Sequence, residues 1–113
     1  MLTNTKIAGT TFHPIPDGQF IRVKQTYDVE GIPCADVDAL LIPEPENQYD
    51  PDAVKVMVPL ENGQAFHIGY LPKDSELKFM VKSMHVANVM IKNFAMNNPH
   101  YCPSWIITEV AGL

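Results

Sequence analysis

The sequence predicts a mainly β protein with one or two short helices, folded as a small, partly open barrel. The chain has 113 residues, which suffices for one domain with its own core, and its ten prolines favour many turns over long helices. Its apolar segments are short, and most have the composition or alternation of strands, which suits a barrel better than a parallel α/β sheet. We therefore treat residues 1–113 as a single domain.

Strands are predicted in the first part of the chain. Ile7–Phe12 has a strand composition, with Gly9 indicating a bulge or a close backbone approach. Phe20–Lys24 alternates apolar and basic residues, as a half-exposed strand does. Tyr27–Pro33 is acidic and rich in turn residues, so we expect a surface loop there. Val37–Ile42 reads as another strand, which is ended by nearby prolines.

The clearest element is a hairpin in the middle of the chain. Valines alternate with other residues along Val54–Val58, and the turn Glu61–Gln64 leads into a second strand at Ala65–Leu71. We expect these two strands to pair antiparallel. Asp50–Asp52, with a proline between two aspartates, predicts a tight turn just before the hairpin.

The last third of the chain is predicted to hold one helix and two strands. Four apolar residues have the spacing of one helical face: Leu77, Met80, Val81 and Met84. Asp74 is the expected N-cap, and Lys78 and Lys82 are expected to point outward. The methionines could instead form a stripe that binds a partner, but their register favours core packing. Val86–Phe94 and Trp105–Val110 have strand composition.

Charge limits the kinds of partner. The net charge is −5, and the segment 28–52 holds eight acidic residues and no lysine or arginine, whereas its flanks are mildly basic. A broad basic face for many phosphates is thereby excluded, so any binding of nucleic acid must be local. The acidic segment is either a solvated face, which we favour, or a docking surface for a basic partner.

Targeting, metal and catalytic signals are weak. No apolar segment approaches the roughly 20 residues that span a bilayer, and the N-terminus lacks a signal-peptide pattern, so we expect a cytoplasmic protein without membrane contact. Cys34 and Cys102 are expected to be free buried thiols. His100 and Cys102 do not make a zinc set. No serine or cysteine has the context of a nucleophile, and turn formation explains the paired acids, so we expect no enzyme, cofactor or metal.

Tyr49, Asp50 and Tyr70 are the residues that most invite a binding interpretation. An aromatic ring beside a carboxylate can stack on a nucleobase while the carboxylate accepts a hydrogen bond from a hydroxyl group. The alternative is that both rings pack on the end of the barrel, and local sequence alone favours it, since half-buried tyrosines are common.

Three ordered blocks, Ala8–His13, Glu44–Val56 and Ile68–Lys73, resemble the signature blocks of the HIRAN domain family. The resemblance implies an OB-like or SH3-like barrel whose closing helix and strands extend to about residue 110. Such domains occur alone in bacteria and phages, the type this chain resembles, or fused to helicase-like ATPases in eukaryotes. Characterised members capture the 3′ end of single-stranded DNA.

The resemblance also implies a set of DNA-binding residues: Thr11, Phe12, His13, Tyr49, Asp50, Tyr70 and Lys73, with His100 and Tyr101 in a later loop. Asp50 would accept the hydrogen bond of a terminal 3′-hydroxyl, three aromatic rings would stack on the last bases, and Lys73 would meet a phosphate. Characterised eukaryotic members carry a basic residue at the position of Thr11.

The predicted function is therefore a non-catalytic module that binds single-stranded DNA at its 3′-hydroxyl end. We expect it to act in DNA repair or replication with a helicase, nuclease or other DNA-processing protein. The alternative is a protein-interaction or regulatory module that keeps the fold without binding DNA ends.

Overall fold

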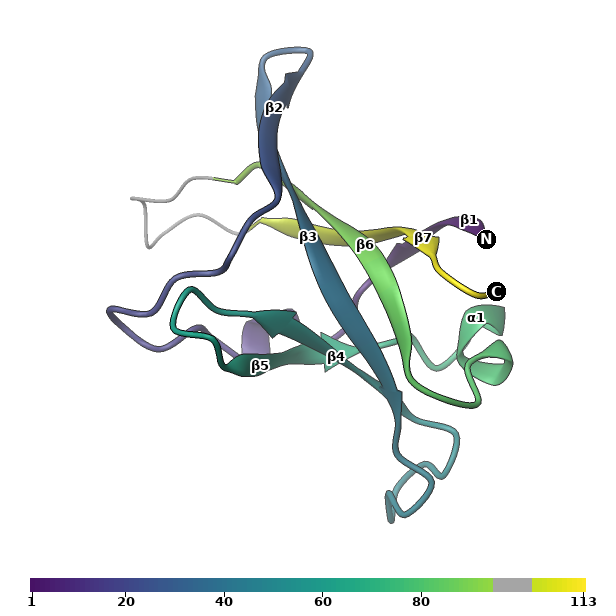
Figure 1. Cartoon of the computed structure of the whole chain (residues 1–113). Helices are drawn as coiled ribbons and strands as arrows, with labels where there is room; N and C mark the ends of the chain where they lie inside the picture. The colour runs from purple at the N-terminus through teal and green to yellow at the C-terminus, as the bar shows by residue number, and fades with distance from the viewer. Residues whose placement is uncertain (95–102) are drawn as a thin grey trace.

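The computed structural model (Figure 1) describes residues 1–94 and 103–113. Within them the chain forms seven strands, one α-helix and one 3-10 helix. Their bounds are β1 Leu2–Lys6, η1 Thr10–Phe12, β2 Gln25–Val29, β3 Ile32–Pro43, β4 Val54–Pro59, β5 Ala65–Tyr70, α1 Glu76–Met80, β6 His85–Lys92 and β7 Ser104–Val110. All the strand pairs are antiparallel.

The long strand β3 organises the sheet. One of its edges pairs with β6 from Cys34 to Leu41, and the other pairs first with β2 and then with β4. Every second side chain of β3 faces the core, and four of these are fully buried: Ala35, Val37, Ala39 and Leu41. The alternating valines of β4 are equally buried, as the two-residue period of a strand requires. Figure 1 shows the β2–β3 hairpin projecting at one end of β3 and the β3–β4 loop at the other.

The sheet curves into a partly open barrel. Its strand order is β1-β7-β6-β3-β4-β5, with β2 beside β3, so β1 and β5 are the two edges that closure must join. The segment after β1 joins them: the Ile7 amide donates to the Trp105 carbonyl of β7, and Ala8 then exchanges two hydrogen bonds of 2.9 and 3.0 Å with Tyr70 of β5. The predicted mainly β class is confirmed, and this single bridge is consistent with the predicted partly open barrel.

Gly69 makes that bridge possible. A Cβ atom on Gly69 would lie 2.4 Å from the Ala8 carbonyl oxygen and 2.8 Å from Cγ2 of Ile7, which is far inside ordinary contact distance. The missing side chain therefore lets the segment after β1 approach β5 closely enough to form both hydrogen bonds.

The hairpin β4–β5 and the strands β6 and β7 agree with the sequence prediction, but three predictions nearer the N-terminus were wrong. Ile7–Phe12 is not a strand, since β1 precedes it and η1 begins at Thr10. Phe20–Lys24 forms only one isolated bridge, from Ile21 to Leu60. Tyr27–Pro33 is not a loop, because it consists of the end of β2, a two-residue turn and the start of β3. Both turn residues, Glu30 and Gly31, have positive φ. Two consecutive residues with positive φ are typical of the two-residue turn that joins neighbouring strands of a hairpin.

The predicted helix is shorter than its apolar pattern suggested. It ends at Met80, because Val81 is already extended, and its N-cap is Ser75 rather than Asp74. Leu77 and Val81 are buried as expected, but Met80 is 47% exposed and Met84, which lies beyond the helix, is 62% exposed. The prediction that these two methionines pack in the core was therefore wrong.

In the described residues, no helix has the length and apolar character needed to cross a membrane. Cys34 is buried with a free thiol, as expected, whereas Cys102 lies outside the described residues.

Candidate functional site

The loop between β3 and β4 is held in shape by Asn47. Its side-chain oxygen accepts hydrogen bonds from the backbone amides of Tyr49 and Asp50, at 2.9 and 3.1 Å. A backbone bond of 2.8 Å from Glu44 to Ala53 closes the base of the loop. These bonds fix the backbone of Tyr49, and its side chain extends into solvent with 98% of it exposed. The expectation that this ring packs on the barrel end was wrong.

The Asp50 carboxylate is partly turned inward and partly open. Its Oδ1 accepts the backbone N–H of Asp52 at 2.9 Å, while its Oδ2 pairs with the ammonium group of Lys78, and the side chain remains 24% exposed. The Lys78 hydrogen bond is the main reason why the pKa of Asp50 is lowered, followed by the Asp52 amide, with a smaller contribution from the charge of Lys73. A carboxylate offers about four acceptor positions, so these two bonds leave capacity for a further donor.

Lys78 is the main charged residue that sequence reasoning placed wrongly. It was expected to point outward from the helix, but only 6% of its side chain is exposed. It extends from α1 to the β3–β4 loop, and its Nζ lies 5.4 Å from the centre of the Phe79 ring. Lys82, the other lysine expected to point outward, is exposed. Helical periodicity could not reveal the difference, because the buried position is defined by a loop 28 residues earlier.

A second group of side chains gathers around β5. The rings of His13 and His67 lie 4.5 Å apart, and the ring of Tyr70 meets His67 edge-on at 4.7 Å. His67 Nε2 donates to the carbonyl of Gly69 at 2.9 Å, which fixes the ring. Burial, chiefly, and the nearby charge of His13 lower the pKa of His67, and they outweigh the opposing Gly69 carbonyl. Sequence reasoning missed His67, because residues 67 and 70 of a regular strand lie on opposite faces. The pairing of β5 with β4 shifts register between His67 and Gly69, which no local pattern indicated.

Glu44 of the β3–β4 loop influences the ionisation of the residues around β5. It belongs to the same loop as Asp50, and its carboxylate, after burial, raises the pKa of Tyr70. It also acts on the charge of His67. The structure therefore places His13 and Tyr70 against the same His67 ring, and Asp50 within range of the charge of Lys73.

The remaining predicted site residues are exposed or lie outside the description. Thr11 and Phe12 of η1 project from the surface, with Phe12 83% exposed, and Gly9 starts η1 with a left-handed backbone. Lys73 is exposed as well. His100 and Tyr101 lie outside the described residues. Among residues 1–94 and 103–113, no three His, Cys, Asp or Glu side chains are grouped to hold a metal ion.

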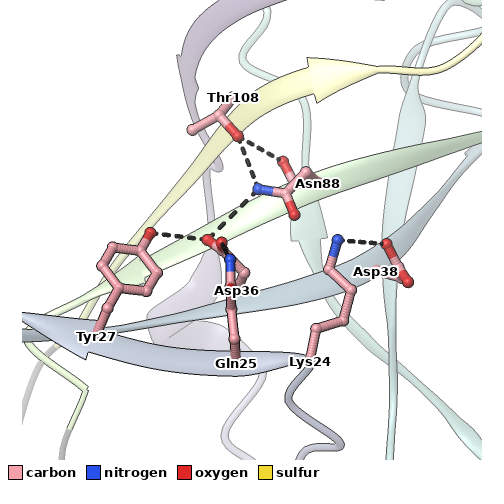
Figure 2. Close-up of polar contacts among 7 residues, drawn as sticks. All are labelled: Lys24, Gln25, Tyr27, Asp36, Asp38, Asn88 and Thr108. Atoms are coloured by element: carbon pink, nitrogen blue, oxygen red, sulfur yellow. Dashed lines mark hydrogen bonds and ion pairs between the residues drawn. The ribbon is translucent and has the colours of Figure 1, made fainter.

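The acidic segment is not one solvated face. Figure 2 shows Asp36, only 9% exposed, accepting hydrogen bonds from the Tyr27 hydroxyl at 2.8 Å, the Gln25 amide at 2.7 Å and, at 3.5 Å, the Asn88 amide. Burial and the Asp36 carboxylate raise the pKa of Tyr27 to about 12. With its donors already in place, Asp36 ties β2 to β3 and β6 and is not a binding group.

Two more acids of this segment are neutralised by lysines. Asp38 pairs with Lys24 at 3.0 Å, as Figure 2 also shows, and Asp50 pairs with Lys78. The expectation of a solvated face was therefore wrong for Asp36, whereas five acids of the segment are exposed: Asp28, Glu30, Asp38, Glu46 and Asp52. The docking of a basic partner on this segment stays an alternative.

Fold and site together define a small β-barrel module that displays exposed aromatic rings and a lysine-paired carboxylate on its loops. The family model for the HIRAN domain matches residues 2–103, and the chain belongs to the HIRAN domain family. HIRAN domains are known as DNA-binding domains. No curated protein and no solved structure matches the chain.

Proposed function

We propose that this HIRAN domain is a non-catalytic module that binds the 3′-hydroxyl end of single-stranded DNA. The observation that carries the proposal is the state of Asp50, an ionised carboxylate that is fixed by two partners and still partly exposed, beside a tyrosine whose ring is wholly free for stacking. A terminal hydroxyl donates a hydrogen bond to such a carboxylate. A 3′-phosphate is repelled by it, and an internal sugar has no 3′-hydroxyl to donate.

The aromatic residues supply the rest of the affinity in this proposal. Phe12, Tyr49 and Tyr70 offer rings at the surface, and stacking of a base on such a ring is worth about 1–3 kcal/mol by alanine substitution. Stacking accepts any base, so sequence preference should be slight. Lys73 is exposed near Asp50 and is suited to the adjacent phosphate.

Charge sets a limit on the affinity. A chain with a net charge of −5 repels a polyanion, and this repulsion grows as salt is removed. The pairing of Asp38 and Asp50 with lysines and the burial of Asp36 reduce the negative potential that DNA would meet. We therefore expect DNA affinity to change little as salt is lowered, whereas the affinity of proteins with a basic groove rises steeply.

The experiment that tests the proposal compares oligonucleotides of one sequence that end in a 3′-hydroxyl, a 3′-phosphate or a blocked 3′ carbon. A hydrogen bond to a charged group is worth about 1.5–3 kcal/mol, so the 3′-hydroxyl strand should bind about tenfold or more tightly than the others. Asp50→Asn should remove most of that preference. Asp52→Asn is the matched control, because it removes the same charge from an exposed side chain of the same loop.

Equal affinity of the wild-type domain for all three strands would refute the proposal. The protein-interaction alternative would be favoured if the domain captured a basic partner protein, kept it after nuclease treatment, and bound none of the oligonucleotides. An assay for cleavage of the same strands with magnesium tests the non-catalytic part of the proposal. The partner we expect, a helicase, nuclease or other DNA-processing protein, is sought by capture on the DNA-loaded domain.

A further inference from the structure

Lys78 has an unusual place for a lysine. Its side chain is almost fully buried, and the Asp50 carboxylate is the one anionic partner it has among the described residues. An ammonium group in such a place is costly unless it is paired, so a specific arrangement of its partner is required. The pair joins α1 to the β3–β4 loop, two elements that are otherwise far apart in the chain.

The two partners of Asp50 hold its carboxylate from two directions. The Asp52 amide engages Oδ1 and the Lys78 ammonium engages Oδ2, so rotation of the carboxylate about its side-chain bonds is restricted. The remaining acceptor positions are those that an incoming donor can reach, since the group is still partly exposed. A hydrogen-bond acceptor whose orientation is fixed before binding loses less freedom on binding.

We propose that Lys78 is a positioning residue of the DNA-end site, which orients the Asp50 carboxylate for the 3′-hydroxyl without itself touching the DNA. The proposal rests on the proposed function of the domain and adds a residue to it. Three groups act on Asp50: Lys78 from α1, the Asp52 amide from the loop itself, and more weakly Lys73. Of these, Lys78 is the largest influence on the pKa of Asp50, which it lowers.

Mutation of Asp50 alone cannot test this idea. Asp50→Asn removes the hydroxyl acceptor and also leaves the buried ammonium of Lys78 without its counter-charge, so two effects are mixed. Lys78→Met is cleaner, because methionine keeps much of the buried aliphatic volume, and the carboxylate it leaves behind is partly in contact with water. We therefore expect the Lys78→Met protein to fold.

The experiment measures the ratio of affinities for the 3′-hydroxyl and 3′-phosphate strands in wild type, Lys78→Met and Lys78→Arg. Lys82→Met is the matched control, since it removes the same charge from an exposed lysine four residues further on. We expect Lys78→Met to lower the ratio by about tenfold, Lys82→Met to leave it unchanged, and Lys78→Arg to retain most of it. If Lys78→Met does not fold, Lys78→Gln replaces it with the same expected loss, because its amide is neutral and is carried on a shorter side chain than the lysine ammonium.

A second readout separates positioning from simple stabilisation. The carboxyl carbon of Asp50, followed by NMR as the DNA-free protein is acidified, should titrate at higher pH in Lys78→Met than in wild type. Preference for the 3′-hydroxyl should then also be lost at a higher pH. A folded Lys78→Met protein that keeps the wild-type ratio overturns the inference and leaves the proposed function standing. A wild-type domain without any end preference removes both.

Discussion

Gly69→Ala tests how the barrel closes. The added methyl group would lie 2.4 Å from the Ala8 carbonyl oxygen, whereas ordinary contact begins at 3.4 Å, so the segment after β1 must move away from β5 by about 1 Å. That movement strains or breaks the two hydrogen bonds between Ala8 and Tyr70. Overpacking costs about 1–3 kcal/mol and each lost hydrogen bond about 0.5–1.5 kcal/mol, so with both bonds broken we expect a loss of about 2–6 kcal/mol of unfolding free energy.

The assay is urea unfolding, with amide hydrogen exchange to locate the damage. The Ala8 and Tyr70 amides should lose protection in Gly69→Ala. Gly63→Ala is the comparison, because Gly63 has a φ of 88° and open space around it, so its cost of about 1 kcal/mol is conformational and should leave the Ala8 amide protected. Gly69→Ala with wild-type stability and a protected Ala8 amide would refute this account of closure.

Three further predictions concern ionisation and packing. Tyr27 should ionise near pH 12, and this step should disappear from the near-ultraviolet titration in Tyr27→Phe. The stability that the raised pKa of Tyr27 contributes is complete below pH 10 and is lost as pH rises toward 12. Asp36→Asn should reduce this loss. Because the folded pKa of His67 lies below 6.5, the unfolded chain takes up its proton first, so acidification through 6.5 should lower the unfolding free energy less in His67→Gln than in wild type. Leu77→Ala should lower the unfolding free energy, measured in urea, by about 2–5 kcal/mol, whereas Met80→Ala should stay within about 0.5 kcal/mol of wild type. Equal losses would show that Met80 packs in the core, as the longer predicted helix required.

Elements with strong local signals were predictable. The β4–β5 hairpin combines alternating valines with a turn that contains Asn62 and Gly63, so local preference and the final fold agree there. β1 and β2 were missed because their residues are mostly polar and exposed, and they are strands through pairing with β7 and β3. Tertiary pairing of this kind leaves no periodic pattern to read.

The site divides in the same way. The turn around Asp50 could be predicted because proline and aspartate define it locally. The partners of that carboxylate could not, since Lys78 reaches it from a helix that the apolar pattern made too long. His67 was overlooked for a related reason: its neighbour His13 lies more than fifty residues earlier, just after the predicted strand Ile7–Phe12, and only the folded barrel brings the two rings together.

The length of β3 has a consequence for how this molecule can change. Three other strands take their register from its twelve residues, and β6 pairs along both halves of it. Insertion of a single residue at its centre would therefore turn the inward-facing side chains of one half outward and break the register with β6. The hairpin tip and the β3–β4 loop lie beyond its two ends and carry no such constraint. Ligand preference can therefore be re-engineered in that loop while the framework that carries it stays intact.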